Sequence, residues 1–156
     1  MPRDGDAAPD FTTPLATGSI ESFTLSERLE AEAPIVLAFF PAAFSSLCTH
    51  ELRTFEDRME EFAGTVYGVS VDSPFALNAF REELGLSFDL VSDFEKDVIE
   101  AYGVRTDFAD LDIMGLARRS VFVVDGDGTV TYSWVSDQPG TEPDYDAVVA
   151  AVEEAR

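Results

Sequence analysis

The chain contains very little cysteine, histidine or lysine. Among its 156 residues, Cys48 is the one cysteine, His50 the one histidine and Lys96 the one lysine. A single cysteine cannot form a disulfide within its own chain. One cysteine and one histidine are also too few for a Cys/His zinc site. We therefore expect no disulfide scaffold, no bound metal and no cofactor.

Basic residues are scarce as a class. Ten Lys and Arg residues stand against 31 Asp and Glu, so the formal net charge is −21, and the acidic residues are spread along the whole chain. Such a field repels nucleic acid, which is bound by basic groups that neutralise its phosphates. Acidity combined with a near-absence of lysine favours a surface adapted to high salt over that of an ordinary acidic cytosolic protein.

Long apolar runs and targeting signals are also missing. No apolar run is long enough to cross a bilayer, and residues 1–6 lack the basic start and apolar stretch of a secretion signal. A hydrophobic content of 46% with thirteen phenylalanines nevertheless indicates a globular protein. We expect one domain over residues 1–156, located in the cytoplasm, without nucleic-acid or membrane partners.

Apolar residues repeat with the two-residue period of strands in some segments and with the helical period in others. Glycines follow two helical stretches, and Asp125–Gly128 is a hairpin signal. In the first half of the chain the sequence predicts a hairpin over residues 10–25, a buried strand over 34–40, a helix from 48 to a stop at 64, and a strand over 65–71. Next it predicts a helix from 74 to 84, a strand over 88–91 and a short helix ending at 103. The last part is predicted as an irregular segment over 105–118, a hairpin of 120–124 and 129–135, and a helix from about 143.

Two strand-and-helix units followed by a hairpin and a terminal helix predict an α/β fold. Its central mixed sheet is flanked by helices on both faces, with a β-hairpin at the N-terminus, which is the layout of the thioredoxin fold. Asp72 or Ser73 is expected to cap the helix that begins at Pro74. Ser92 and Glu95 fit a capping box for the following short helix.

Cys48 lies at a turn from strand to helix. The apolar stretch from Ile35 to Phe40 ends at Pro41, and the helical pattern begins near Cys48 and continues through Leu52. The free amide groups and the dipole of a helix N-terminus favour negative charge, which biases a thiol toward the reactive thiolate. The spacing from Cys48 to Leu52 also directs the thiol toward the protein interior.

A hydroxyl group lies three residues before this cysteine. Thioredoxin-type exchange requires a Cys-x-x-Cys pair, but Ser45 occupies the first position of that motif, which excludes dithiol exchange within the chain. At that place the Ser45 hydroxyl can donate a hydrogen bond to the thiolate and contact an oxygen atom bound beside it.

The pattern Pro41-x-x-x-Ser45-x-x-Cys48 resembles the active-site signature of the peroxiredoxins, the alkyl hydroperoxide reductase and thiol-specific antioxidant proteins. The resemblance covers nearly the whole chain and includes further blocks in the family's order. These blocks are Val69-Ser70-Val71-Asp72-Ser73-Pro74, Leu90-Val91-Ser92-Asp93 with Ala101-Tyr102-Gly103-Val104, and Arg119-Ser120-Val121-Phe122-Val123-Val124-Asp125-x-x-Gly128.

The resemblance implies a role for each residue of the site. Cys48 would attack the O–O bond of a peroxide and become a sulfenic acid. Arg119 would hold the thiolate and polarise the peroxide oxygens. Pro41 would shield the thiol from water, Ser45 would bind both sulfur and peroxide, and Glu51 would orient the arginine.

Each of these residues also has a simpler interpretation. Cys48 could be a buried structural cysteine, and Arg119 a surface residue whose place in the site belongs to Arg118. Ser45 could serve only the turn, and Glu51 could be a first-turn acid stabilised by the helix dipole. His50 lies two residues from Cys48, so on a helix the two side chains point apart, and we expect His50 on the surface.

The chain departs from the commoner peroxiredoxin pattern at three points. Ser45 replaces the more frequent threonine, Thr49 stands where proline often follows the cysteine, and no second cysteine exists to resolve the sulfenic acid. The resemblance is therefore to the one-cysteine class. Its reductant comes from outside, as a small thiol or a thioredoxin- or glutaredoxin-like protein.

The sequence thus predicts a thiol-dependent peroxidase for hydrogen peroxide or organic hydroperoxides. One alternative is a peroxide sensor oxidised at Cys48 without efficient turnover, and another is an inert interaction module of the same fold. A homodimer is a further expectation, with Met114 and Leu116 of the irregular segment contributing apolar contacts.

Overall fold

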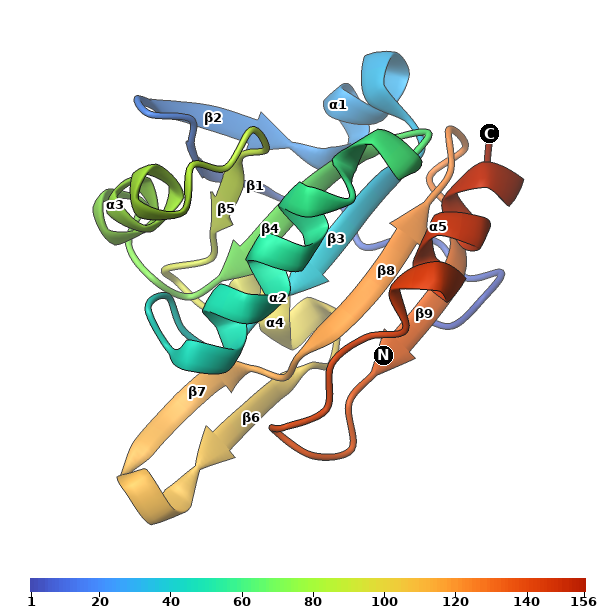
Figure 1. Ribbon diagram of the computed structural model, residues 1–156. Coiled ribbons are helices and arrows are strands. Elements are labelled where there is room, and N and C mark those ends of the chain that lie inside the picture. Colours follow the sequence, from blue (N-terminus) through green and yellow to red (C-terminus); the bar gives the residue numbers. More distant parts are fainter.

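The computed structural model describes residues 1–156, and a seven-stranded mixed sheet forms its centre (Figure 1). The strands are β1 (Thr12–Ala16), β2 (Ile20–Thr24), β3 (Ile35–Phe39), β4 (Thr65–Ser70), β5 (Leu90–Ser92), β8 (Ser120–Val124) and β9 (Val130–Val135). Their order across the sheet is β2-β1-β5-β4-β3-β8-β9. The neighbours β3, β4 and β5 are parallel, and all other neighbouring pairs are antiparallel.

Five α-helices cover the two faces of this sheet (Figure 1). They are α1 (Leu25–Glu32), α2 (Ser46–Asp57), α3 (Pro74–Leu84), α4 (Asp97–Ala101) and α5 (Tyr145–Glu154). Buried residues of α2, α3 and α5 share one apolar cluster, and those of α1 and α4 share the cluster on the opposite face. The predicted mixed sheet with helices on both faces is therefore confirmed. None of the helices is long and apolar enough to span a bilayer.

The central strand β3 explains why both faces can be covered. All of its residues are buried, and successive side chains enter opposite clusters: Val36 and Ala38 pack beneath α2 and α5, whereas Leu37 and Phe39 pack beneath α1 and α4. A strand that is apolar on both faces is stable only between two layers. Its last residues carry the chain directly into the turn that holds Cys48.

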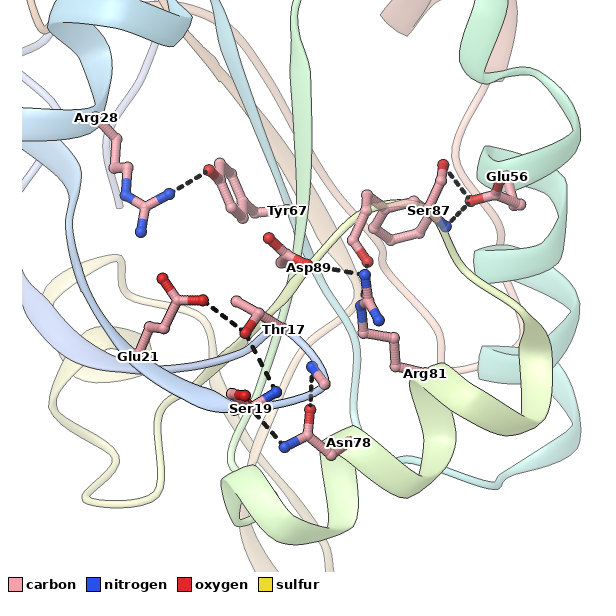
Figure 2. Close-up of polar contacts among 12 residues, drawn as sticks. Thr17, Ser19, Glu21, Arg28, Glu56, Tyr67, Asn78, Arg81, Ser87 and Asp89 are labelled. Atoms are coloured by element: carbon pink, nitrogen blue, oxygen red, sulfur yellow. Dashed lines mark hydrogen bonds and ion pairs between the residues drawn. The ribbon is translucent and has the colours of Figure 1, made fainter.

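The N-terminal hairpin is fixed to α3 by side-chain hydrogen bonds (Figure 2). Asn78 accepts from the Gly18 amide at 2.8 Å and donates to the Ser19 carbonyl at 3.0 Å. On the same helix, Arg81 donates to the Phe88 carbonyl and pairs with Asp89 at 3.1 Å. These contacts anchor the turn between β1 and β2, whose two strands form the hairpin predicted from the sequence.

The prediction of an irregular segment over residues 105–118 was wrong. This segment forms a second hairpin, of β6 (Arg105–Phe108) and β7 (Ile113–Ala117), which projects beyond the central sheet (Figure 1). Asp112 adopts a left-handed conformation at its turn, and the Asp107 carboxylate accepts a hydrogen bond from the Gly115 amide at 2.8 Å. Most residues of this hairpin are exposed, so no core pattern revealed its strands in the sequence.

Other boundaries also differ from the predictions. Helix α1 was not predicted, and α2 ends at Asp57, ahead of a short 3₁₀ turn, instead of continuing to Gly64. Strand β5 begins two residues later than expected. The capping box of Ser92 and Glu95 is not formed, because the Asp93 carboxylate instead accepts from the first amides of α4, those of Val98 and Ile99. Ser73 caps α3 as predicted, accepting from the Ala76 amide.

Candidate active site

The site lies where β3 runs into α2. Antiparallel pairing between β3 and β8 places Phe39 opposite Ser120. Continuing this register by one residue brings Arg119, which precedes β8, beside Phe40, which precedes Pro41. The carbonyl of Arg119 also accepts a hydrogen bond from the Ser136 amide at 2.9 Å. A residue 71 positions from Cys48 is thereby fixed beside the turn that carries the thiol.

Three buried polar side chains meet at this point. Cys48 and Glu51 lie on the inward face of the first turns of α2, three residues apart, so one partner can reach both. The Arg119 guanidinium donates from Nη2 to Cys48 Sγ at 3.4 Å and from Nη1 to Glu51 Oε1 at 2.5 Å. All three residues are buried, and the thiol is 0% exposed. A cation held by a carboxylate therefore directs a donor at the sulfur.

Burial governs the charge balance of this cluster. It raises the pKa of Glu51 to about 7, although Arg119 opposes the shift and Glu142 adds to it. Burial alone would lower the pKa of Arg119, but Glu51 and Cys48 outweigh it, so the net direction is upward. Two atoms of the pair, Glu51 Oε2 and Arg119 Nε, are buried without a hydrogen-bond partner. The carboxylate thus becomes protonated close to neutral pH, whereas the arginine keeps its charge.

The loop from Pro41 to Ser45 is held in an unusual conformation. Phe44 has a φ of 68°, a left-handed value that is uncommon for a bulky residue, and its exposed ring packs on Phe80 at a centroid distance of 5.0 Å. The Asp72 carboxylate accepts hydrogen bonds from the Ala43 amide and the Ser70 hydroxyl. These two contacts fix the loop immediately before the helix that presents the thiol.

A second polar network lies next to Glu51. The Glu142 carboxylate is 2.7 Å from His50 Nδ1 and accepts from the Tyr145 hydroxyl at 2.8 Å. Burial alone would raise the pKa of Glu142, but these hydrogen bonds outweigh it and the net direction is downward. An anionic Glu142 therefore links the start of α2 to α5 and acts on the charge of Glu51.

The predicted site residues fall into two groups. Arg119 contacts both Cys48 and Glu51, and Pro41 is buried and lines a small cavity together with Arg119. Ser45 is exposed, and its hydroxyl donates to the Ala42 carbonyl at 3.0 Å rather than to the sulfur. Arg118 is exposed and does not contact the thiol, and His50 lies on the surface as expected.

Sequence reasoning missed part of this arrangement. Asp72 was considered only as a helix cap, yet it anchors the loop before Cys48. Glu142 was not considered at all. Glu142 and Glu51 come from distant parts of the chain and influence each other through their charges, and neither the spacing nor the pattern of the sequence signals this.

Comparison with known proteins agrees with this geometry. Residues 5–133 match the AhpC/TSA family. The chain belongs to the AhpC/TSA family. It is 32% identical over 153 residues to a thiol peroxidase of Mycobacterium tuberculosis, covering 97% of this chain and 89% of that protein. It is 35% identical to a chloroplastic 2-cysteine peroxiredoxin of Chattonella marina, covering 86% of this chain and 71% of the relative.

A solved structure of the same family has the same fold. The crystal structure of a peroxidoxin from Mycobacterium tuberculosis superimposes with a TM-score of 0.84 at 30% sequence identity, covering 100% of this chain and 99% of the other. The thioredoxin-like, peroxiredoxin-type fold predicted from the sequence is thereby confirmed. Within this AhpC/TSA-family fold, Cys48 is the only residue able to act as a thiol nucleophile.

Proposed function

We propose that the protein is a thiol-dependent peroxidase in which Cys48 is the peroxide-reducing residue. The observation that supports this most directly is the contact of 3.4 Å between Arg119 Nη2 and Cys48 Sγ inside a buried site. A guanidinium donor stabilises negative charge on sulfur. The same donor stabilises the charge that develops on the leaving oxygen when the O–O bond breaks.

The oxidative step follows from this arrangement. The Cys48 sulfur attacks one oxygen of a hydroperoxide, the S–O bond forms, and the O–O bond breaks. The leaving oxygen departs as an alcohol, or as water when hydrogen peroxide reacts, after taking up the proton that the thiol has lost. The sulfur is oxidised to a sulfenic acid, and the peroxide is reduced by two electrons.

The reductive step requires thiols from outside the chain. One external thiol attacks the sulfenic sulfur, which releases water and leaves a mixed disulfide with Cys48. A second thiol attacks this disulfide, restores the Cys48 thiol and leaves with the oxidised reductant. Since the chain has no other cysteine, both thiols belong to a small-molecule or thioredoxin- or glutaredoxin-like reductant.

The surrounding residues support the first step in different ways. Glu51 orients Arg119 through the bond at its Nη1, which leaves Nη2 directed at the sulfur. Pro41, buried two residues after the end of β3, keeps water from this side of the site. Ser45 contributes to peroxide binding only after its hydroxyl turns from the Ala42 carbonyl, which it now contacts.

Replacement of the nucleophile tests the proposal. Wild-type protein should consume hydrogen peroxide in the presence of dithiothreitol, and Cys48→Ser should reduce this to the uncatalysed rate because no sulfenic acid can form. Mass spectrometry after dimedone treatment should detect the sulfenic acid adduct on wild type only. The matched control is Ser46→Ala, a hydroxyl change at an exposed neighbouring position. Equal turnover by wild type and Cys48→Ser would sink the proposal.

The alternative of a peroxide sensor without turnover is less well supported. Relatives that share at least 30% identity over most of the chain are named thiol peroxidase or peroxiredoxin. Sustained consumption of many equivalents of peroxide per protein molecule distinguishes the enzyme from a sensor, which stops after one equivalent.

Two finer proposals concern solution behaviour. The net charge of −21 supports adaptation to high salt, and the exposed Leu111, Ile113 and Met114 on the β6–β7 hairpin support association with a second copy. Sedimentation at low and high salt tests the dimer, and a monomer throughout would contradict it. Melting temperatures at low and high salt test the adaptation, and lower stability at high salt would contradict it. The cytoplasmic location stays a prediction from the sequence.

A further inference from the structure

A small cavity adjoins the buried site on the side of the β6–β7 hairpin. Its volume is about 70 Å³, enough for a carboxylate group and a few water molecules. Arg119, which contacts the Cys48 sulfur, and Pro41 are part of its wall. Arg118, Phe108, Gln138 and Pro139 complete most of the rest. Arg119 therefore belongs both to the cavity wall and to the contacts of the sulfur.

The cavity is cationic in a strongly anionic protein. Two arginines and one aspartate, Asp137, line it, whereas the whole chain has a net charge of −21. Most of the other arginines hold a carboxylate of the chain; these are Arg28, Arg58, Arg81, Arg105, Arg119 and Arg156. Arg118 holds none, although Asp137 lies in the same wall. It is thus an unpaired guanidinium beside the active site.

Hydrogen bonds fix the backbone of Arg118, from which the guanidinium extends. The Arg118 amide donates to the Val104 carbonyl at 2.6 Å, and its own carbonyl accepts from the Ser120 hydroxyl. Thr106 and Phe108 alternate with exposed neighbours on β6, so their half-buried side chains form one face, and both line the cavity. The opposite wall, around Ser136, is tied to Arg119 by a backbone hydrogen bond.

From this placement we propose that Arg118 and the cavity form a subsite for the carboxylate of an organic hydroperoxide. A guanidinium matches the planar geometry of a carboxylate, and Phe108 and Pro139 provide apolar contact for the short chain that joins the carboxylate to the peroxide group. The small volume admits the carboxylate end but no bulky group. The favoured substrates are hydroperoxides that carry a carboxylate a few bonds from the O–O group. This inference deepens the proposed function and depends on it only for the identity of the reaction.

The first test uses alkylation of Cys48 and requires no peroxidase activity. Iodoacetate and iodoacetamide differ in one carboxylate, and the chain has a single cysteine to label. Since both reagents need the same exposure of the thiol, the ratio of their rates isolates recognition of the carboxylate. We expect Arg118→Gln to lower this ratio about fivefold, the upper range for an exposed ion pair, with mass spectrometry as the readout.

The second test uses peroxides. The value of kcat/KM is compared for a carboxylate-bearing alkyl hydroperoxide and for its methyl ester. The ratio of the two should fall about fivefold in Arg118→Gln. The matched control in both tests is Arg53→Gln, which removes the same charge from an exposed, unpaired arginine on α2. In this control the ratios should stay at the wild-type value.

Three results would overturn the inference. Unchanged ratios in Arg118→Gln would show that the guanidinium does not recognise the carboxylate. Equal losses in Arg53→Gln would show that only the general charge of the protein matters. A change confined to the reductive step, seen with mercaptopropionate against mercaptoethanol, would assign Arg118 to the reductant instead. Failure of the peroxidase proposal itself would appear separately, as absent peroxide turnover in wild type.

Discussion

Arg118 and Arg119 are adjacent in the chain, but they occupy two different regions of the site. Arg119 belongs to the buried cluster with Glu51 and Cys48, which we call the floor of the site. Arg118 belongs to the wall of the neighbouring cavity, which we call the mouth; there it is exposed and has no partner among the acidic residues of the chain. Both arginines line the same cavity, between the end of β7 and the start of β8, so one short segment supplies both a paired, buried cation and an unpaired, exposed one.

The difference between the two regions lies in what each charge costs the fold. A buried charge without its partner destabilises a protein by about 3–5 kcal/mol, so the floor must keep its ion pair complete. An exposed charge carries no such cost, so the mouth can present an unpaired guanidinium to a ligand. Variants of the floor should therefore affect the reaction and the fold together, whereas variants of the mouth should affect only the choice of ligand.

The largest effect is expected from Arg119→Lys. Lysine keeps the charge but lacks the planar guanidinium that contacts Cys48 and Glu51 at once. The second-order rate constant for hydrogen peroxide, measured by stopped-flow oxidation, should fall by about 10²–10³-fold. Arg53→Lys on the surface of α2 is the matched control and should stay within about twofold. A fully active Arg119→Lys would show that the floor needs only a positive charge.

An intermediate effect is expected from Glu51→Gln. The variant weakens the orientation of Arg119, so peroxide reactivity should fall about tenfold, the equivalent of ~1.4 kcal/mol. It also removes a titrating group whose pKa is raised from 4.5 in the unfolded chain to about 7. Between these values the folded protein binds a proton that the unfolded chain has lost, so this group's contribution to stability decreases as the pH rises.

Melting temperatures across pH test this second part. The melting temperature of wild type relative to Glu51→Gln should decrease from pH 4.5 to 7 and level off above that range. Titration of Asp89 and Asp93, whose pKa values burial also raises, cancels in this difference. A constant difference over the whole range would show that the Glu51 carboxylate titrates as an ordinary exposed acid.

The smallest effect is expected from Glu142→Gln, at a residue that contacts His50 and Tyr145 and neither of the two arginines. Its charge contributes to the raised pKa of Glu51, so the variant should move the pH transition of the melting temperature to a lower pH. Peroxide reactivity should change by no more than about twofold, because Glu142 contacts neither Arg119 nor Cys48. The matched control is Glu153→Gln, an exposed acid on α5. An unchanged pH transition of the melting temperature would show that Glu142 does not influence the pKa of Glu51.

Local pattern was sufficient to predict the part of the site that a short segment forms. The apolar stretch that becomes β3 and the helical spacing after Cys48 placed the thiol at the correct turn. This prediction depends on residues within about one or two helical turns, where periodicity carries the information. The role of Glu51 was implied only by the resemblance to the peroxiredoxins, and its burial on α2 was not predicted.

The remaining parts of the site depend on how distant strands pair and pack, and no short pattern in the sequence encodes this register. The choice between Arg118 and Arg119 follows from the pairing of Phe39 with Ser120, a contact between distant strands. The bond between His50 and Glu142 joins residues 92 positions apart. The capping error at Ser92 has a similar cause. The local pattern indicated Ser92 and Glu95, whereas the three-dimensional arrangement uses the Asp93 carboxylate, which was not considered as a cap.

The complete burial of the Cys48 sulfur has a consequence for which step limits the rate of the catalytic cycle. A hydroperoxide presents only its terminal oxygen, which small movements of the loop can admit. A reductant must bring in a second sulfur with its attached chain, so we expect the buried Cys48 sulfur to become exposed through a rearrangement of its surroundings before the disulfide can form. Reduction is then gated by the protein, and its rate should reach a plateau as reductant is added. At that plateau the enzyme's own motion, and not the supply of thiol, limits turnover.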